Sequence, residues 1–279
     1  MQIIYEDNHI LAVSKTCHEI VQADKTGDEP LSETLKRFIK ERDQKPGNVF
    51  LGVTHRLDRP TTGVVLFAKT SKALERLNRM FATGEVHKTY WCIVPNVWGE
   101  FESLKVREFE STPQTSQTLQ TLQTPQTLQT PQTSQTPQTS ALRNQTPPPE
   151  ADLTHWLVRN EKQNRSYAYD ERPLDRQGNP LKEAKEARLH YKVIGTTERY
   201  ALLEVRLYTG RHHQIRCQLS YIGLTIKGDL KYGAPRSNPD GGISLHSRKA
   251  EFIHPVSKES VTIVAPVPDD ALWKVLSDV

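Results

Sequence analysis

The stretch that decides the fold of this 279-residue chain is Val53-Thr54-His55-Arg56-Leu57-Asp58-Arg59-Pro60-Thr61-Thr62-Gly63-Val64-Val65-Leu66-Phe67. Its two ends are apolar and rich in valine, which predicts two short buried strands. The residues from Thr54 to Gly63 predict a loop, because Pro60 fixes the backbone and Gly63 permits a turn. A polar loop between two buried strands is a common place for functional residues.

Outward from this segment, apolar periodicity predicts short strands and helices in irregular order. The predicted strands cover residues 2–5, 10–14, 89–94, 189–194 and 200–208. Four helices are predicted. The first is opened by Pro30 and has the apolar stripe Leu31, Leu35, Phe38 and Ile39, and the second is capped by Ser71 and buries Leu74, Leu77 and Phe81. The third runs from Arg211 to Tyr221, and the last begins at Asp269-Asp270 and contains Leu272, Trp273 and Leu276. Because strands cluster without regular βαβ alternation, we expect an α+β fold with a mixed, mainly antiparallel central sheet and flanking helices.

The composition changes abruptly between Ser111 and Pro149. From Thr112 to Thr139 every third residue is Thr, in a Thr-x-Gln repeat whose middle residue is Pro, Ser or Leu. A segment with so few apolar residues and recurrent Pro cannot build a core. We therefore expect residues 111–150 to be a disordered low-complexity insertion, with a Gln-rich self-association segment as the alternative. Residues 1–110 and 151–279 then form a single domain.

The remaining composition excludes several classes of protein. No apolar run approaches the roughly 20 residues of a membrane span, and the N-terminus does not resemble a signal peptide. The spacing of Cys17, Cys92 and Cys217 suits neither a disulfide framework nor a zinc site, which indicates a reducing, cytoplasmic setting. A net charge of +4 favours a polyanionic partner only weakly.

Asp58 is the residue of the opening segment best suited to chemistry, since Arg56 and Arg59 flank it. Most such neighbours form a surface ion pair, which is the first interpretation. The second is a carboxylate that positive neighbours keep ionised, as a nucleophile or a base requires.

Two further clusters contain reactive groups. Thr209-Gly210-Arg211-His212-His213-Gln214-Ile215-Arg216 lies where a strand turns into a helix, and its arginines and N–H groups suit a phosphate or carboxylate. We expect Arg216 at the margin of the buried helix stripe, within reach of an acid. His212 and His213 should point in different directions, which argues against a metal site. Lys88 and Tyr90 share one face of a strand, although an isolated tyrosine is more often a core residue.

In this order, the clusters resemble the motifs of RluA-type RNA pseudouridine synthases. The matching pieces are His-Arg-Leu-Asp-Arg-x-Thr-Thr-Gly at 55–63, Lys-x-Tyr at 88–90, Thr-Gly-Arg-x-His-Gln-Ile-Arg at 209–216, Ile226-Lys227-Gly228-Asp229, Tyr232-Gly233, Leu245-His246 and Phe252-Ile253-His254-Pro255. The resemblance covers nearly everything outside the repeat. It implies a stand-alone catalytic domain with the pseudouridine synthase fold.

The resemblance implies an isomerase that converts specific uridines of ribosomal or transfer RNA to pseudouridine, with no cofactor and no metal. The N1–C1′ bond breaks, the uracil turns, and it is rejoined through C5. Asp58 would be the catalytic carboxylate, by attack on C1′, by attack on C6 of the base, or by removal of a proton from C2′. Arg216 would be the salt-bridge partner that keeps Asp58 ionised, and Tyr90 would stack on the uracil and help to move the C5 proton.

The implied substrate is folded RNA, from which the target uridine must be flipped out. The resemblance suggests that Arg56 fills the vacated stack, and that Arg59, Lys88, Arg211 and Lys227 contact phosphates. It implies no obligate protein partner, and we expect a monomer in the cytoplasm.

Three features depart from the family pattern. Thr62 stands where Ser is common, and Lys15-Thr16-Cys17-His18 stands where Lys-Pro-x-Gly is usual, which would alter the geometry of that turn. The first strand, from Ile3, leaves no room for the small N-terminal RNA-binding domain of many relatives, so target choice would rest on the catalytic domain.

Two other functions compete with this one. An RNA-binding or chaperone protein on the same scaffold would not need Asp58, Tyr90 and Arg216, all of which are present. A hydrolase of glycosidic bonds would need two carboxylates on either side of the bond. No second acid accompanies Asp58 in its motif.

Overall fold

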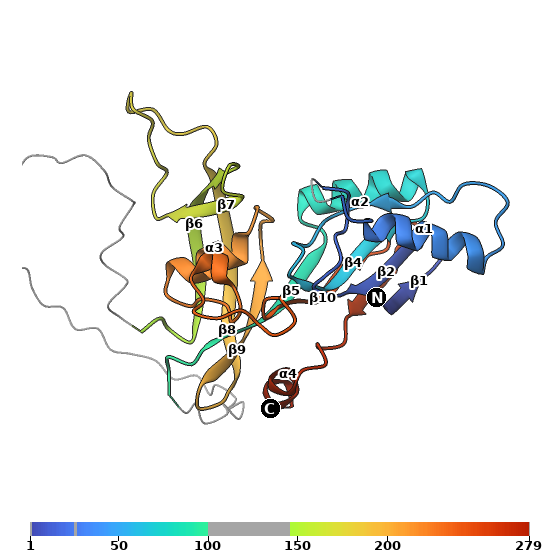
Figure 1. The fold of residues 1–279 in the computed structure, drawn as a ribbon. Coiled ribbons are helices and arrows are strands. Elements are labelled where there is room, and N and C mark those ends of the chain that lie inside the picture. The colour runs from blue at the N-terminus through green and yellow to red at the C-terminus, as the bar shows by residue number, and fades with distance from the viewer. Residues whose placement is uncertain (1, 25–26, 100–145, 279) are drawn as a thin grey trace, which may run out of the picture.

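One sheet runs through the residues that the computed structural model describes, 2–24, 27–99 and 146–278 (Figure 1). Its 11 strands have the order β1-β2-β4-β10-β5-β9-β8-β6-β7, with β3 beside β4 and β11 beside β10. The strands are β1 (Gln2–Glu6), β2 (Ile10–Lys15), β3 (Gly52–Val53), β4 (Thr62–Ala68), β5 (His87–Pro95), β6 (Glu150–Asn160), β7 (Arg165–Tyr169), β8 (Lys185–Thr196), β9 (Tyr200–Leu207), β10 (Leu245–Ile253) and β11 (Ser260–Val264). Among these pairings only β4 with β10 is parallel, so the mixed, mainly antiparallel sheet is confirmed.

The helices lie at different parts of this sheet. They are α1 (Leu31–Arg42), α2 (Ser71–Thr83), α3 (Gln214–Tyr221) and α4 (Ala271–Ser277), with a 3-10 turn η1 (Leu230–Tyr232). Figure 1 shows α1 and α2 at the end of the sheet that contains β1, β2 and β4, and α3 beside β6 to β9. None of the helices in the described ranges is long and apolar enough to cross a membrane.

The main core lies on the face of the sheet that α1 and α3 cover. Alternate residues of a strand point to opposite faces, so Val65 of β4 packs in one cluster with Leu35 of α1 and Ile215 of α3. Val64 points the other way, into a cluster with Leu77 of α2. Residues of β5 and β9, including Tyr90, extend the first cluster to the middle of the sheet.

The parallel contact between β4 and β10 brings the loop before β4 to the centre of the sheet. Gly63 has φ +109°, and a Cβ there would lie 2.2 Å from the backbone oxygen of Ser247. Only glycine can make so close an approach. Ser247 in turn pairs with Tyr90 of β5, so the start of β4, and with it the end of the preceding loop at Thr61, lies near that tyrosine. The loop predicted to run to Gly63 is thus shorter than expected, because Thr62 and Gly63 already belong to the strand.

Several expected boundaries are corrected by the structure. The cap of α2 is Thr70, not Ser71, because the Thr70 side chain accepts a hydrogen bond from the Ala73 N–H. The helix expected from Arg211 begins only at Gln214, since His213 has left-handed backbone angles. Strands β6, β7, β10 and β11 have no counterpart among the predicted elements.

The end of the insertion also differs from the expectation. The carbonyl of Pro147 accepts a hydrogen bond from the Trp98 indole at 2.6 Å, and that of Pro148 accepts one from the Tyr191 hydroxyl at 2.7 Å. Glu150 already belongs to β6. Residues 147–150 are therefore part of the folded domain, whereas the Thr-x-Gln repeat lies outside the described residues.

Candidate active site

A cleft of about 90 Å³ lies at the centre of the sheet, where the loop before β4 meets the start of α3. Its walls are formed by Arg56, Leu57, Asp58 and Thr61 of the loop, by Tyr90, Leu207 and Leu245 of β5, β9 and β10, and by Arg211, His213, Gln214, Ile215 and Arg216. Two sequence clusters about 150 residues apart, together with the strand that carries Tyr90, thus meet at one place. Asp58, Tyr90 and Arg216 all line the cleft.

Asp58 and Arg216 form an ion pair, with Nη1 of the arginine 2.9 Å from Oδ2 of the aspartate. The Asp58 side chain keeps 31% of its surface exposed, whereas that of Arg216 keeps 5%. Burial raises the pKa of Asp58, but His213 and Arg216 outweigh the burial and hold this pKa below its usual value. The carboxylate is therefore ionised at neutral pH and remains open to the cleft.

Arg216 is itself held by a second carboxylate, that of Asp229. Nε and Nη2 of Arg216 donate to the two oxygens of Asp229 at 2.7 and 2.8 Å, a bidentate geometry. The Asp229 side chain is 1% exposed. Arg216 thus reaches a part-buried acid as expected, but it does not lie at the margin of the buried helix stripe, because it is itself buried between two acids.

Asp229 had no role in the sequence interpretation, although it ends one of the matching pieces. A lone acid 13 residues after an arginine does not predict a pair, since only the turn between α3 and η1 brings the two together. Burial lowers the pKa of Arg216, but Asp229 and Asp58 outweigh it and raise this pKa.

His213 also contacts the aspartate, with Nε2 at 3.5 Å from Oδ2 of Asp58. Its ring stacks on that of His212, with centroids 3.8 Å apart and planes 21° from parallel. The expectation that the two rings point in different directions is thus wrong, because the left-handed backbone of His213 turns its side chain back over its neighbour. No cluster of His, Cys, Asp or Glu among the described residues is arranged to hold a metal ion.

Tyr90 lines the cleft from β5 and is almost completely buried. Burial raises its pKa to about 12, against a hydrogen bond with the Ser247 side chain that lowers it. The phenol is therefore protonated at neutral pH and can donate a hydrogen bond. Leu57, Leu207 and Ile215 give the cleft apolar sides beside it.

Lys15 holds the loop that carries Asp58. Its Nζ donates to the backbone carbonyls of Asp58, Arg59 and Thr61 at 3.3, 2.8 and 2.8 Å, and to that of Thr16 at 2.7 Å. The lysine is 1% exposed, and burial lowers its pKa to about 8. The sequence predicted no function for Lys15, because the only local signal was the replacement of the usual Pro and Gly in the turn after it.

The five predicted RNA-binding residues are placed in two groups. Arg56 and Arg211 line the cleft and are exposed. The other three do not line it: Arg59 forms an ion pair with Asp28, Lys88 lies over the Phe81 ring, and Lys227 donates to Asn238 Oδ1 at 2.7 Å.

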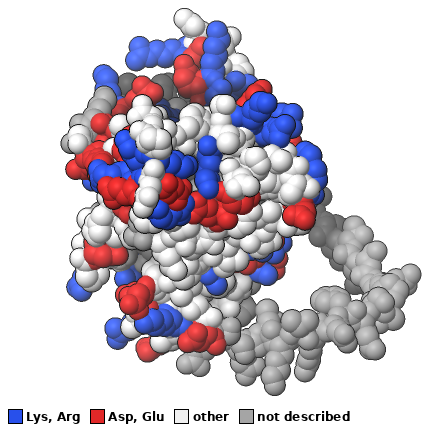
Figure 2. Space-filling view, turned by 90° about the vertical axis from the view of Figure 1, so that its right-hand side faces the viewer, with Lys and Arg blue, Asp and Glu red and all other residues white. Residues whose placement is uncertain are grey.

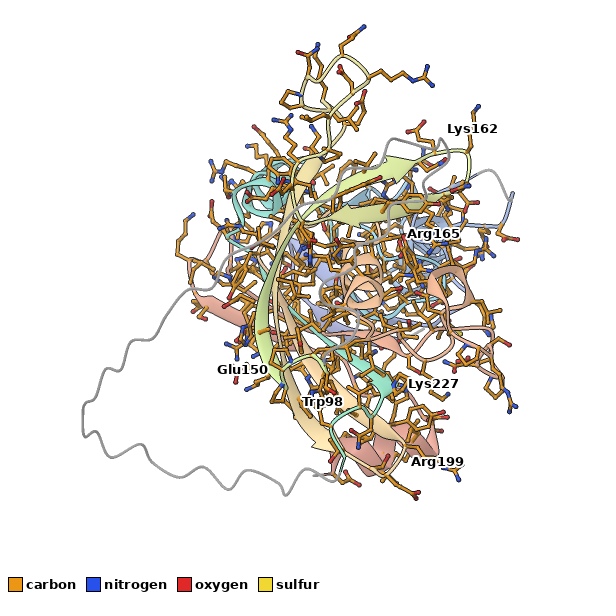
Figure 3. All side chains as sticks on the ribbon, turned by 90° about the vertical axis from the view of Figure 1, so that its left-hand side faces the viewer. Trp98, Glu150, Lys162, Arg165, Arg199 and Lys227 are labelled. Carbon is orange, nitrogen blue, oxygen red and sulfur yellow. The ribbon has the colours of Figure 1, made fainter. Side chains whose placement is uncertain are left out.

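Three cations that were not predicted lie near His212 and Tyr232, outside the cleft lining itself, and we call them the basic rim: Arg159, Arg165 and Lys231. Arg165 lies 5.0 Å above the Tyr232 ring, and Lys231 donates to the Asn164 carbonyl at 3.1 Å. Within the described residues, none of the three forms an ion pair. Figure 3 shows Lys162 at the β6–β7 turn, Arg165 below it, and Lys227 lower still in this view.

The opposite side of the molecule has a different charge pattern. Figure 2 shows Lys and Arg interspersed with Asp and Glu over the upper part of that face. On α1, for example, Arg42 pairs with Glu6 and Lys36 pairs with Glu33. The basic rim thus differs from α1, where Lys36, Arg37 and Arg42 each pair with a carboxylate.

Similarity to known proteins agrees with this geometry. A profile of the RNA pseudouridylate synthase family matches residues 9–221. Ribosomal large subunit pseudouridine synthase D of Xylella fastidiosa is 27% identical over 97% of this chain and 67% of its own length. The tRNA pseudouridine synthase C of Vibrio cholerae is 26% identical over 98% of this chain and 93% of its own.

Among solved structures, human RNA pseudouridylate synthase domain containing 4 has a TM-score of 0.65 at 21% identity, and covers 96% of this chain and 89% of its own. This likeness shows that the fold is shared. The sequence match extends over most of the described sheet and over both clusters that meet at the cleft. The chain belongs to the RNA pseudouridylate synthase family and is an isomerase that converts uridine to pseudouridine.

Proposed function

We propose that this enzyme isomerises uridines of ribosomal or transfer RNA with Asp58 as its catalytic carboxylate. One observation carries the proposal: the ionised Asp58 is fixed by Arg216 and faces the same cleft as Tyr90. The names of the similar synthases, which refer to the large ribosomal subunit and to tRNA, support the two classes of RNA.

The chemistry requires that N1–C1′ breaks and C5–C1′ forms, while C5 loses a proton and N1 gains one. An ionised Asp58 can begin this exchange by attack on C1′, by attack on C6, or by removal of the C2′ proton. Tyr90, protonated at neutral pH, can stack on the uracil and donate a proton or a hydrogen bond. The apolar sides of the cleft limit access of water to the detached uracil.

The basic rim and the exposed arginines of the cleft suit the RNA strand. Arg56 stands at the mouth and can fill the stack that a flipped uridine leaves. Arg211 and the three rim cations can bind the phosphates beside that nucleotide, because none of them forms an ion pair with a carboxylate of the described residues. Arg59, Lys88 and Lys227 lie outside the cleft lining, so we expect them to contribute less.

The decisive variant is Asp58→Asn. It keeps the shape of the side chain but has no negative charge, so we expect no detectable pseudouridine and RNA binding within a few-fold of wild type. Purified RNA is incubated with each protein, and its nucleosides are separated and quantified. Asp43→Asn is a matched control, since Asp43 also pairs with an arginine, Arg42, but on the surface.

Each alternative function has its own outcome in this experiment. Pseudouridine formed by Asp58→Asn contradicts the catalytic assignment. Free uracil released by the wild-type protein indicates a hydrolase, and RNA binding with no product from wild type indicates a binding protein. Comparison of pseudouridines across all RNAs of cells with and without the enzyme then names the substrate, and a monomer in the cytoplasm stays a prediction.

A further inference from the structure

His213 lies between Asp58 and a tyrosine from another part of the chain. Its Nδ1 is 3.0 Å from the hydroxyl of Tyr232, and its Nε2 is 3.5 Å from Oδ2 of Asp58. The residue is buried and has φ +52°, a conformation that few residues other than glycine adopt. The surrounding contacts therefore fix this ring in one place.

The direction of the Tyr232 hydroxyl decides which nitrogen of His213 carries the proton. The hydroxyl oxygen accepts a hydrogen bond from the Ser166 N–H at 2.8 Å, so its own proton is free to point to Nδ1. Burial raises the pKa of Tyr232, which keeps that proton in place. A neutral imidazole has one donor and one acceptor, so an accepting Nδ1 leaves the proton on Nε2, facing Asp58.

His213 is neutral under ordinary conditions. Burial lowers its pKa to about 3, and Arg216, His212 and Lys231 act in the same direction, against the opposing effect of Asp58. The ring therefore presents Asp58 with a neutral N–H donor, while Arg216 supplies the positive charge.

Both donors converge on the same oxygen of Asp58. Nη1 of Arg216 and Nε2 of His213 contact Oδ2, whereas Oδ1 makes no hydrogen bond with any described residue. The terminal torsion of an aspartate is soft, so one contact alone would let the carboxylate rotate. Two donors on one oxygen would limit this rotation and leave Oδ1 available to a substrate in the cleft that Asp58 lines.

We propose that His213 and Tyr232 are positioning residues for Asp58: Tyr232 fixes the tautomer of His213, whose Nε2–H together with Arg216 holds Oδ2 and leaves Oδ1 as the reacting oxygen. The reacting-oxygen part rests on the proposed catalytic function of Asp58, whereas the tautomer does not. The same short segment supports both donors, since Asp229 holds Arg216 and Tyr232 holds His213.

The tautomer is tested without RNA. In protein labelled with ¹⁵N-histidine, NMR distinguishes a protonated ring nitrogen from an unprotonated one, and the His213→Gln variant identifies the signals of His213. We expect a proton on Nε2 in wild type and a mixed or reversed tautomer in Tyr232→Phe. A proton on Nδ1 in wild type, or an unchanged tautomer in Tyr232→Phe, overturns the proposal even if Asp58 is the catalytic carboxylate.

The consequence for the reaction is tested by a double-mutant cycle on single-turnover rates. Tyr232→Phe should slow pseudouridine formation about tenfold with little change in KM, because the donor to a charged group is lost in part of the molecules. Glutamine has an amide donor at about the reach of Nε2 and no tautomers. In the His213→Gln background, Tyr232→Phe should therefore have no further effect on the rate, and independent, multiplying losses contradict the proposal.

Two further variants separate positioning from loss of structure. Tyr191→Phe also removes a buried hydroxyl, one that donates to the Pro148 carbonyl, and should lower the melting temperature without slowing the reaction. His213→Asn has its amide at the position of Nδ1, too short to reach Asp58, and should be slower than His213→Gln. Equal rates for the Asn and Gln variants contradict the proposal even if Tyr232→Phe fails to fold.

Discussion

The two walls that meet at the cleft are held by different kinds of bonds. On one wall, the hydrogen bonds of Lys15 to the loop of Asp58 all go to backbone carbonyls. On the other wall, Asp229 and Tyr232 bind the functional side chains of Arg216 and His213 themselves. The contacts of the first wall thus fix the backbone path of the Asp58 loop, and those of the second wall fix the orientations of the Arg216 and His213 side chains.

This difference follows from what each wall supplies. The loop provides one carboxylate, whose direction is set by donors from outside the loop, so it needs only a fixed backbone. The opposite wall provides those donors, Arg216 and His213. A long arginine side chain adopts many orientations unless a second group holds it in one of them. Variants of the two walls should therefore fail in different ways.

Arg216→Ala should have the largest effect after Asp58→Asn. It leaves Asp229 buried without a positive partner, which costs about 3–5 kcal/mol of unfolding free energy. Without the charge and hydrogen bond of Arg216 the pKa of Asp58 rises, so the acid limb of the rate profile should move to higher pH. The measurement is kcat/KM between pH 5 and 9, together with urea unfolding. A normal rate at neutral pH contradicts the salt-bridge role.

Asp229→Asn tests whether Asp229 supports catalysis by fixing the orientation of the Arg216 side chain. The amide keeps the shape but cannot accept two charge-assisted bonds, so Arg216 becomes mobile and we expect a loss of about 1–3 kcal/mol in stability and about tenfold in kcat. Single-turnover kinetics and thermal unfolding measure the two effects. An unchanged kcat with lower stability would mean that Asp229 only supports the fold.

Lys15→Met should remove the backbone contacts of the first wall. Three carbonyls of the Asp58 loop lose their donor, which costs about 1–3 kcal/mol, and kcat should fall less than in Asp229→Asn. If the walls are independent, the stability losses of Lys15→Met and Asp229→Asn add within about 0.5 kcal/mol in the double variant. A large deviation from additivity contradicts the separation of the two walls.

Lys15 also predicts a dependence of stability on pH. Its pKa is about 8 in the folded chain, against 10.5 for an ordinary lysine, so between these values the unfolded chain keeps a proton that the folded chain has lost. This group therefore makes wild type more stable as pH rises from 8 to 10.5, and its contribution is lost as pH falls through 8. The unfolding free energy of wild type minus that of Lys15→Met, measured across this range, should increase with pH, and a flat difference contradicts the shift.

Deletion of the Thr-x-Gln repeat, residues 112–139, should have the smallest effect because its sequence has too few apolar residues to contribute to a core. We expect turnover and melting temperature close to those of wild type, measured with the same RNA. A deletion that runs on to Pro149 is the informative counterpart: it removes the carbonyls that Trp98 and Tyr191 bind, so its melting temperature should be lower. A collapse of activity in the shorter deletion contradicts our interpretation of the repeat.

The sequence by itself determined the parts of this protein that local chemistry fixes. Apolar spacing predicted β2, β4, α1 and α2, because buried faces impose periods of 2 and 3.6 on the chain. The order of three motifs identified the family, whereas the turn predicted at Gly63 is wrong, because this glycine lies in β4 and pairs with Ser247. The same motifs singled out Asp58, Tyr90 and Arg216, which line one cleft.

Only the tertiary structure decided how those residues are supported. Lys15, Asp229 and Tyr232 act on partners 13 to 46 residues away, through bonds that no periodicity encodes. The tertiary structure also distinguishes cations that are already bound from those that are not. Arg59 and Lys227 are bound to neighbouring side chains, whereas the basic rim has no carboxylate partner in the described chain. A residue type and its spacing indicate what a side chain can do, but burial and the nearest opposing group decide what it does, and these arise only when distant segments pack together.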